Sequence, residues 1–499
     1  MTTRPNVLVI QADQFRWDCT GAAGNPDVET PALDSLAADG VLYTEAFCPL
    51  PVCTPSRYSL LSGRPVHQHG GWTNRSTLAP GIDTFPRALR RAGYRTAAVG
   101  KMHFTPTYLD VGYDRLVLAE QHGPGRYDDD YHRALRAAGL APVVDLLDQE
   151  EQLRASAAPA YWTTYGTGRS DLPEQWHSTT WIGEQARREL DAWTDGGGQL
   201  LHVSFIKPHH PFDPPAPWDE RYHPDALSIL PGWTEAIPEQ DRRYGNEYFG
   251  YDGLTEATLR TVMAHYYATI TQLDHQIALL LDRLRDRGMY DDTLVVFTSD
   301  HGEYLGFHHL LLKNGPMYDP LAKVPLVVKF PGTRASRRDA SLVSLIDVAP
   351  TVLAAAGLAP ADLLPGRDLA DPSQSRSCVF AENRHGPAAF MARTATHKLL
   401  AYDDPTRDAF YDLAADPYEL DNRIADPACA QLIGELRDAL ANWVLFDTPP
   451  PVHLDEGAPT IDAPNVPPRD PIRHTEHRDW FAARAAESAA RPDFAPWRG

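Results

Sequence analysis

Cysteine is scarce in this sequence, and the spacing of the few cysteines does not suit a set of disulfides or a shared metal site. The chain has 499 residues and five cysteines, at positions 19, 48, 53, 378 and 429. Their number is odd and they form no C-x-x-C pair, which argues against a disulfide framework and a zinc ribbon. We expect four of them to be ordinary buried thiols, and only Cys53 has neighbours that indicate chemistry.

Basic charge and long apolar runs are also lacking. The 46 lysines and arginines are outnumbered by 67 aspartates and glutamates, which gives a formal net charge of −21. Nucleic-acid scaffolds and proteins that bind anionic membranes need a net basic surface, so we expect neither partner. No apolar stretch approaches the ~20 residues that cross a bilayer. The first residues, MTTRPNVLVIQADQ, contain no secretory h-region or cleavage site, and we therefore expect a cytoplasmic protein.

Strand-like and helix-like segments alternate through the first three quarters of the chain. Apolar runs predict buried strands, and apolar residues spaced by three and four predict helices. The predicted strands are NVLVI (6–10), VLYTEA (41–46), YRTAAVG (94–100), QLLHVSFI (199–206), TLVVFTS (293–299) and VPLVVKF (324–330). The predicted helices are PALDSLAAD (31–39), TFPRALRRAG (84–93) and a long helix through 263–284. This alternation predicts an α/β fold with a large, mostly parallel sheet and helices on both faces.

Polar residues cluster where three of these strands end. QADQ (11–14), KPHHP (207–211) and TSDHG (298–302) each follow a predicted strand, and ligands of such sheets bind beyond the carboxyl ends of the strands. The prolines that begin at Pro208 should end the strand before them. Residues 105–180 show little periodicity and are predicted to be an insertion around the site.

The last quarter of the chain predicts a second, smaller unit. From residue 375, short strand-like pieces such as CVFAEN (378–383) and HKLLAY (397–402) alternate with turns, and a helix is predicted within 430–445. We therefore divide the chain into a catalytic α/β domain (1–374), a small α+β subdomain with an antiparallel sheet (375–448) and a Pro-rich arm (449–499). The arm either covers this subunit or a neighbour in a homo-oligomer, or is a disordered tail.

Cys53 lies at the start of a predicted helix. Thr54 can cap this helix, Pro55 suits its first turn and Gly63 can end it. At the positive end of the helix dipole, a thiol should have a lowered pKa and an anion is favoured. An ordinary buried cysteine beside a helix start fits the same residues, and the local sequence does not separate the two readings.

Cys53 also stands in a longer pattern. The segment C-T-P-S-R (53–57) resembles the C-x-P-x-R core of the type I sulfatases of the alkaline phosphatase superfamily, and Ser59 to Arg64 continue that signature approximately. A second signature, G-Y-x-T-x-x-x-G-K-x-H, is present as GYRTAAVGKMH (93–103). The other motifs follow in family order over positions 6 to about 420. This resemblance implies an alkaline phosphatase-like α/β fold and conversion of the cysteine to formylglycine by a formylglycine-generating enzyme.

The strand ends offer ligands for a divalent cation. Asp13, Gln14, Asp300 and His301 supply mainly oxygen atoms, which a hard cation prefers. The resemblance implies that the ion is Ca²⁺, with the modified Cys53 as a further ligand. Many family members have Asp where Gln14 stands and Asn where His301 stands, so Mn²⁺ and Mg²⁺ are alternative ions. A carboxylate that caps a helix is the alternative for Asp13 alone.

The resemblance also assigns catalytic roles. One hydroxyl of the hydrated formylglycine attacks sulfur, and the other drives collapse of the sulfated intermediate. Arg57 steadies the hydrate, and His103 takes a proton in the collapse step. Lys101 and Lys313 bind the sulfate oxygens.

Two further side chains are expected to contact the substrate. His209, in the P-H-x-P segment, is the candidate acid that protonates the leaving alcohol and binds it. Asn74 resembles a substrate-contacting asparagine of related enzymes. His210, His308 and His309 are expected to be structural hydrogen bonders.

These motifs predict a sulfuric ester hydrolase that acts on a small-molecule sulfate monoester. The nearest alternative is a phosphonate monoester or phosphodiester hydrolase with the same metal pairs, in which Tyr and Thr typically replace Lys101 and His103. A catalytically inactive anion-binding protein would keep Cys53 as a thiol. A zinc phosphatase is disfavoured because the nucleophile position is Cys and the ligand set is too small for two zinc ions. The motifs do not specify the leaving alcohol.

Overall fold

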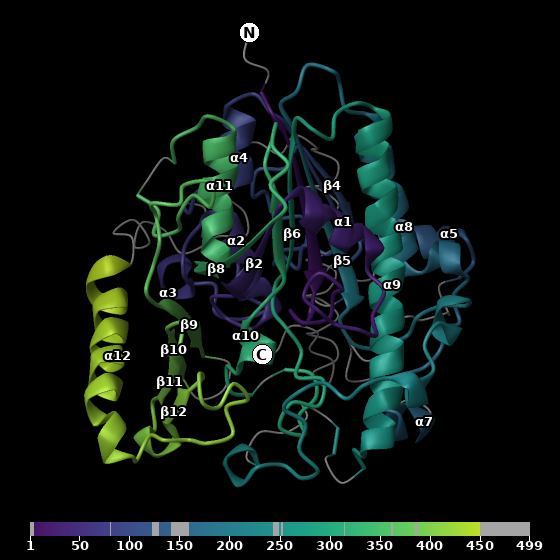
Figure 1. The fold of residues 1–499 in the computed structure, drawn as a ribbon. Helices are drawn as coiled ribbons and strands as arrows, with labels where there is room; N and C mark the ends of the chain where they lie inside the picture. Colours follow the sequence, from purple (N-terminus) through teal and green to yellow (C-terminus); the bar gives the residue numbers. More distant parts are fainter. Residues whose placement is uncertain are drawn as a thin grey trace, which may run out of the picture.

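The structure is a computed structural model of the chain (Figure 1). It describes residues 4–79, 81–121, 129–140, 159–242, 249–250, 253–313, 315–360, 363–384 and 388–449. The predicted arm at 449–499 therefore lies outside the described residues, apart from residue 449.

Eight strands form one large sheet through the centre of the molecule (Figure 1). Their order is β4-β3-β5-β1-β6-β7-β2-β8, and only β7 runs antiparallel to its neighbours. The strands are β1 (Asn6–Asp13), β2 (Val41–Phe47), β3 (Arg95–Gly100), β4 (Arg115–Leu118), β5 (Gln199–Pro208), β6 (Thr293–Ser299), β7 (Leu326–Lys329) and β8 (Arg337–Ser344). The predicted large, mostly parallel sheet is confirmed.

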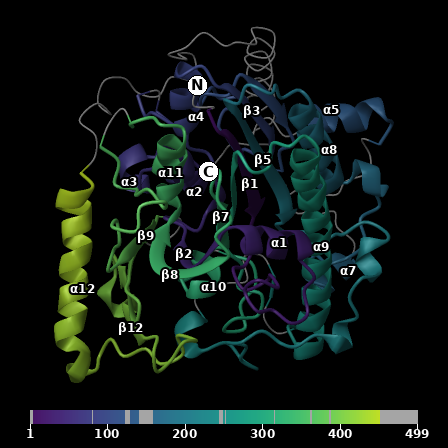
Figure 2. The ribbon, with the colours of Figure 1, turned by 45° about the horizontal axis from the view of Figure 1, so that its top comes forward.

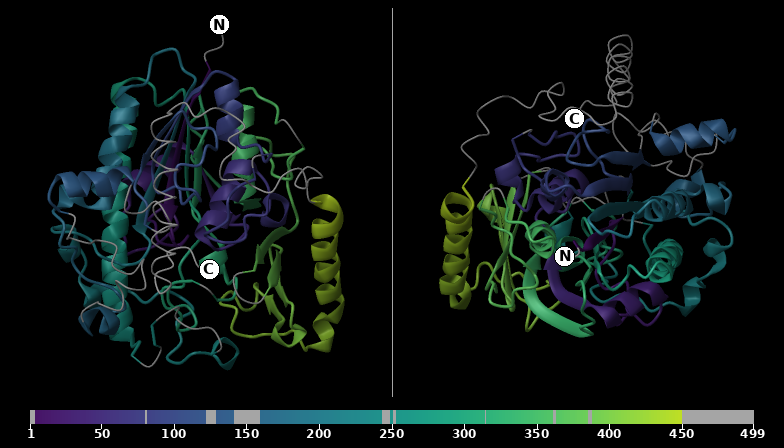
Figure 3. Two further views of the ribbon diagram at one scale, coloured as in Figure 1. Left: turned by 180° about the vertical axis from the view of Figure 1, so that it is seen from behind. Right: turned by 90° about the horizontal axis from the view of Figure 1, so that it is seen from above.

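Helices cover both faces of this sheet (Figures 2 and 3). Alternate residues of β1 point to opposite faces, so Leu8 and Ile10 join one hydrophobic core while Val7 and Val9 join the other. The first core is completed by α1 (Pro31–Asp39), α8 (Ser178–Asp191) and α9 (Glu256–Asp286). The second core is completed by α2 (Cys53–Ser62), α4 (Phe85–Arg91) and α11 (Val348–Ala355). The shorter helices are α3 (Val66–His69), α5 (Asp130–Ala137), α7 (Pro159–Thr163) and α10 (Asp319–Ala322).

The long predicted helix is α9, which spans 31 residues along one side of the sheet (Figure 1). It begins where the Thr255 side chain accepts the N–H of Thr258 at 3.2 Å. Its buried stripe includes Ile270, Leu273 and Ile277, as the spacing of apolar residues predicts. No helix among the described residues has the length and apolar character needed to cross a membrane.

A second, antiparallel sheet follows in the C-terminal region. Its strands, in the order β12-β11-β10-β9, are β9 (Val379–Asn383), β10 (Ala389–Arg393), β11 (His397–Tyr402) and β12 (Ala409–Asp412). One face packs against α12 (Ala430–Asn442), and the other shares a core with Phe47 and Leu321 of the large unit. The predicted antiparallel sheet is confirmed, while the boundary at residue 375 stays a prediction.

Two edge strands were missed, and one strand is slightly longer than predicted. The edge strand β8 was missed because five of its eight residues are not buried and its sequence, RRDASLVS, reads as a polar loop. The edge strand β4 lies inside the segment predicted to be an insertion, and its four residues pair in parallel with β3. The strand β5 ends at Pro208, as the prolines predict, two residues beyond the predicted range 199–206.

Candidate active site

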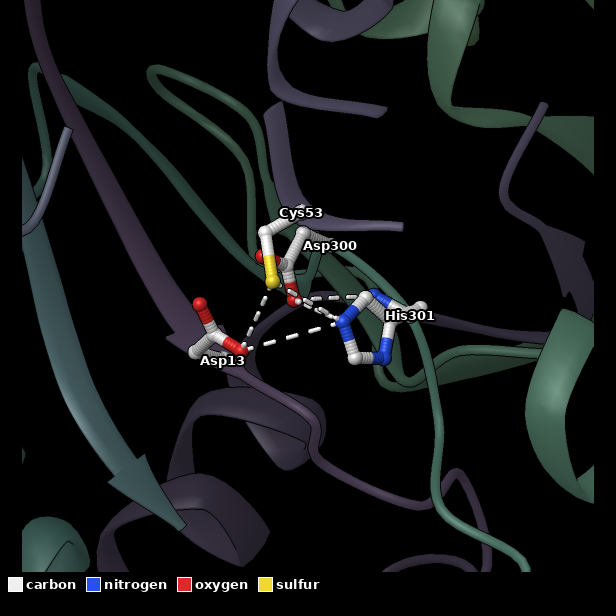
Figure 4. Close-up of side chains that lie close together, drawn as sticks. All are labelled: Asp13, Cys53, Asp300 and His301. Carbon is white, nitrogen blue, oxygen red and sulfur yellow. Dashed lines mark hydrogen bonds and ion pairs between the residues drawn. The ribbon is translucent and has the colours of Figure 1, made fainter. Parts of the chain in front are cut away.

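Four side chains that can bind a metal converge at the carboxyl ends of β1 and β6 (Figure 4). Asp13 is the last residue of β1, Asp300 and His301 follow β6, and Cys53 begins α2. Their ligand atoms all lie within 4.8 Å of one another, and all four residues are buried. Because β1 and β6 are parallel neighbours, the residues that follow them meet at one edge of the sheet. The structure thus brings together four of the five predicted ligands.

Gln14, the fifth predicted ligand, adopts a left-handed backbone with φ 61°. Its N–H donates to Asp300 Oδ1 at 3.1 Å, and its side-chain Nε2 donates to the carboxylate of Glu303. With Nε2 held in this way, the amide oxygen is buried and has no hydrogen-bond partner among the described residues. A buried acceptor in this state fits an oxygen ligand of a hard cation.

The imidazole of His301 has the tautomer that a metal requires. Its Nδ1 lies 2.9 Å from the carbonyl oxygen of Gly302, so Nδ1 donates a proton there and Nε2 keeps a lone pair. Nε2 lies 3.3 Å from Cys53 Sγ and 3.8 Å from an oxygen of both Asp13 and Asp300. Burial lowers the pKa of His301, although the Asp300 carboxylate opposes the shift. Two carboxylates, an amide oxygen and a neutral imidazole fit a divalent cation such as Ca²⁺, Mn²⁺ or Mg²⁺.

Arg57 joins the two carboxylates. Its Nε lies 2.9 Å from Asp300 Oδ2, and its Nη2 lies 2.9 Å from Asp13 Oδ2. Nη1 donates to the carbonyl oxygen of Lys101 at 2.5 Å and to Ser204 Oγ at 2.7 Å. Burial alone would lower the pKa of Arg57, but the two carboxylates raise it, so the guanidinium stays charged. This buried cation holds the two acidic ligands at a fixed separation.

The surroundings of Cys53 differ from the expectation for a helix start. The cap residue is Val52, not Thr54, whose Oγ1 instead donates to the carbonyl oxygen of His103 at 2.8 Å. Burial, together with the Asp13 carboxylate, raises the pKa of Cys53 to about 11. The expected lowering by the helix dipole was therefore wrong, because Cys53 is 1% exposed and removal from water outweighs the dipole. Gly63 ends the helix as predicted, with φ 69°.

Lys101, which directly follows β3, contacts the carboxylate of Asp13. Gly100 precedes it with φ 99°, and a Cβ at this position would lie 2.0 Å from the carbonyl oxygen of Ser204, so only glycine fits. Lys101 Nζ lies 2.7 Å from Asp13 Oδ2. Although burial would raise the pKa of Asp13, Lys101 and the other cations hold it well below its usual value. His103 follows with φ 56°, and its carbonyl group contacts Thr54 beside the start of α2.

Lys313 and His209 complete the cluster of side chains formed by Asp13, Cys53 and His301. Lys313 Nζ is 3.2 Å from Cys53 Sγ and 2.9 Å from His209 Nε2. His209 Nε2 is 4.0 Å from Asp13 Oδ1. Burial, together with Lys313 and Lys101, lowers the pKa of His209 well below its usual value. Lys313 therefore contacts the sulfur atom of Cys53 directly, and the predicted acid, His209, lies beside Lys313.

The remaining predicted residues are placed as follows. The side-chain oxygen of Asn74 accepts the N–H of Thr54 at 3.0 Å, which puts Asn74 beside the start of α2. His308 contacts Asp241 at 2.8 Å and the carbonyl oxygen of Tyr418 at 2.7 Å. His309 and His210 contact the backbone carbonyl oxygens of residues 234 and 165.

Three supporting residues were missed by the sequence analysis. They are Glu303, which holds the amide of Gln14, Ser204, which accepts from Arg57, and Gln121, which contacts Lys101. The signal that could have found Gln121 is the polar pair EQ that follows the apolar strand RLVL at the sheet edge. Glu303 belongs to no strand or helix and is recognised only by its contact with a residue 289 positions away.

Comparisons with known proteins agree with this geometry. The sulfatase family model matches residues 5–358, and a model described as "N-sulphoglucosamine sulphohydrolase, C-terminal" matches residues 306–444. An arylsulfatase of Clostridium perfringens is 28% identical over 470 residues, which cover 88% of this chain and 94% of that protein. A multifunctional alkaline phosphatase superfamily protein of Trinickia caryophylli is 27% identical, over 89% of this chain and 96% of its own.

A solved structure adds a second kind of relative. The phosphonate monoester hydrolase of Agrobacterium radiobacter superposes with a TM-score of 0.75 at 26% identity, covering 88% of this chain and 95% of that one. The fold and the ligand cluster thus define a hydrolase of the alkaline phosphatase superfamily. Within it, the chain belongs to the sulfatase family, whose enzymes hydrolyse sulfuric esters.

Proposed function

We propose that this protein hydrolyses a small-molecule sulfate monoester, with formylglycine derived from Cys53 as its nucleophile. The observation that carries the proposal is the position of Cys53 Sγ. It lies 3.6 Å from Asp13 Oδ1, 3.3 Å from His301 Nε2 and 3.2 Å from Lys313 Nζ, so the sulfur atom contacts two of the candidate metal ligands and a cation. In the mature enzyme, the hydroxyl groups of the hydrated aldehyde would take the place of this sulfur atom.

The cation would be held by Asp13, Gln14, Asp300, His301 and the modified residue 53. When bound, it would act as a Lewis acid that makes a hydroxyl group at position 53 easier to ionise. We propose Ca²⁺ as the ion, with Mn²⁺ and Mg²⁺ as alternatives, because four of the five positions offer oxygen and one offers nitrogen.

Charge at the site supports an anionic substrate. Three cations, Arg57, Lys101 and Lys313, are buried with two carboxylates, Asp13 and Asp300, so these side chains carry an excess of positive charge before any metal binds. A sulfate monoester carries one negative charge and would be attracted to this site. In the proposed reaction, Lys313 would contact a sulfate oxygen and stabilise the charge that develops during transfer.

His209 is placed to move a proton at the leaving oxygen. Its Nδ1 lies 2.7 Å from the carbonyl oxygen of His210, so Nδ1 donates there and keeps its proton. Its Nε2 faces Lys313 and Asp13 and is the atom that would gain a proton and give it to the alcohol. Overall, water replaces the alcohol on sulfur, and the S–O bond to the leaving group breaks.

Phosphonate monoester hydrolysis is the second candidate. It is favoured by the likeness to the phosphonate monoester hydrolase of Agrobacterium radiobacter. A phosphonate monoester carries the same single negative charge, so charge alone does not separate the two substrates. The residue at position 101 favours sulfate, because this chain has the Lys of the sulfatases where the phosphonate monoester hydrolases typically have Tyr.

Initial rates on two substrates test the choice. We expect the purified, metal-loaded enzyme to hydrolyse 4-nitrophenyl sulfate with a higher kcat/KM than 4-nitrophenyl phenylphosphonate. A large preference for the phosphonate would overturn the sulfatase proposal in favour of its rival. Hydrolysis of neither ester, in protein whose residue 53 is converted, would contradict both.

Intact-mass spectrometry tests the nucleophile separately. Conversion of Cys53 breaks its Cβ–Sγ bond, releases the sulfur as sulfide and forms the C=O bond of an aldehyde. This is a two-electron oxidation for which the formylglycine-generating enzyme needs an oxidant such as O₂, and it lowers the mass by ~18 Da. Cys53→Ser should become trapped as a sulfate ester with a gain of about 80 Da, because a serine lacks the second hydroxyl needed for release. Cys429→Ser is the matched control and should keep the mass loss at Cys53 and full activity. An unmodified, fully active protein would refute the formylglycine proposal.

A further inference from the structure

Gln121 links two groups of the proposed catalytic machinery. It lies three residues after the end of β4 and is 0% exposed. Its Oε1 accepts a hydrogen bond from Lys101 Nζ at 2.8 Å. Its Nε2 lies 2.8 Å from the carbonyl oxygen of His210 and 3.0 Å from Nδ1 of His209. One amide thus spans the distance between β3 and the loop after β5.

The amide can adopt only one orientation. The ammonium of Lys101 has donors and no acceptor, so the oxygen of Gln121 must face it. The nitrogen then faces the carbonyl oxygen of His210, where only a donor is satisfied. A rotation of the amide by 180° would place donor against donor at one end and acceptor against acceptor at the other.

This orientation fixes the direction of Lys101. Its Nζ contacts Asp13 Oδ2 at 2.7 Å and Gln121 Oε1 at 2.8 Å. An ammonium has three N–H groups in a tetrahedral arrangement, so two fixed hydrogen bonds determine the direction of the third. Asp13 alone would leave the ammonium free to rotate about a single contact.

The same amide fixes the loop that carries His209. Its bond to the carbonyl oxygen of His210 holds the acceptor on which His209 Nδ1 also depends, at 2.7 Å. The ring orientation of His209 is therefore coupled, through one side chain, to the position of Lys101. A shift of about 1 Å at either group is enough to weaken catalysis strongly.

We propose that Gln121 is a positioning residue that aims the third N–H of Lys101 at a sulfate oxygen and orients His209 toward the leaving oxygen. The inference rests on the proposed sulfatase function. Neither the sequence motifs nor the family match singles out this residue. It acts through Lys101 and His209, and not on the substrate itself.

A leaving-group comparison tests the link to His209. In metal-loaded enzyme with residue 53 converted, Gln121→Leu should lower kcat/KM about tenfold for 4-nitrophenyl sulfate and about 100-fold for phenyl sulfate. The difference is expected because phenolate is the poorer leaving group and needs the proton of His209. In a His209→Ala background, Gln121→Leu should lower both rates equally. Equal losses for both esters in the wild-type background would overturn the proposal.

Binding of inorganic sulfate tests the link to Lys101 without turnover. Calorimetry should give a Kd about tenfold weaker for Gln121→Leu than for wild type. Gln272→Leu is the matched control, since Gln272 is also 0% exposed but lies in α9, and it should leave the Kd unchanged. An unchanged Kd in Gln121→Leu would overturn the proposal, even if the enzyme proved to have no sulfatase activity.

A second variant tests the same proposal if Gln121→Leu fails to fold. If Gln121→Leu does not fold, Gln121→Glu keeps the size of the side chain and the acceptor for Lys101, but it removes the donor to His210 and adds a carboxyl group beside Lys101. It should still lower the rate on phenyl sulfate more than the rate on 4-nitrophenyl sulfate. Equal losses on the two esters would again contradict the proposal.

Discussion

Replacement of Arg57 should destabilise the protein, and the loss should depend on the metal. The guanidinium is 2% exposed and contacts Asp13 and Asp300 at 2.9 Å each. Arg57→Met keeps an unbranched side chain as far as the ε position and removes both ion pairs. Breaking a buried ion pair typically costs about 3–5 kcal/mol, because a charge is left without its partner. Arg57→Lys keeps the charge but not the two-pronged geometry, and we expect a loss of about 1–3 kcal/mol.

Denaturant unfolding with and without a divalent cation measures this dependence. In chelator, Arg57→Met leaves the carboxylates of Asp13 and Asp300 close together without the guanidinium, and the loss should be largest. A bound divalent cation would take over part of that neutralisation. We therefore expect saturating Ca²⁺ to reduce the loss by at least about 1 kcal/mol, through preferential binding to the folded variant.

Arg90→Met is the matched control for this experiment. Arg90 is 6% exposed and contacts both oxygens of Asp110, at 2.9 and 3.1 Å, outside the ligand cluster. Its loss should be the same in chelator and in Ca²⁺. An equal loss for Arg57→Met in the two conditions would refute the view that Arg57 and a cation share the neutralisation of these carboxylates.

Three further variants are informative. Glu303→Gln should turn the amide of Gln14 so that nitrogen faces the cation, and calorimetry should show at least about tenfold weaker Ca²⁺ binding with the fold intact. Burial raises the pKa of Asp274 to about 7, so the folded state retains a proton that the unfolded chain loses near pH 4. The free energy of unfolding should therefore fall as pH rises from about 4 to 7, by at most about 1.4 kcal/mol per pH unit. Urea titrations at several pH values should show that Asp274→Asn removes this slope. Gly100→Ala should lower the thermal midpoint by many degrees, since its Cβ would meet the carbonyl oxygen of Ser204 at 2.0 Å, and an unchanged midpoint would contradict the stated geometry.

Elements with a buried face were predictable from the sequence. The helix α1 begins at Pro31 and ends at Asp39 as predicted, because its leucines recur at helical spacing and Gly40 follows. Strand direction was not predictable: β7 has the same apolar composition as the parallel strands but runs antiparallel to β6 and β2. The edge strands were missed because an edge needs little apolar character.

The residues of the candidate site also fall into two groups, those that the sequence predicts and those that it does not. Residues within motifs, such as Asp13 and Asp300, were expected at strand ends and are found there. Contacts that join distant parts of the chain were not predictable, because nothing local marks them. The bond between Gln14 and Glu303 spans 289 positions. The pKa of Cys53 was predicted in the wrong direction because burial cannot be read from ten residues of sequence.

The burial of α2 has a consequence for the timing of maturation. All ten residues of this helix are buried, and Cys53 itself is 1% exposed. If Cys53 is converted as proposed, the modifying enzyme must reach a side chain that the finished fold buries. Conversion would therefore take place on the nascent or unfolded chain. Protein that folds with an unconverted thiol should stay inactive when the formylglycine-generating enzyme is added later, and should be rescued only after unfolding.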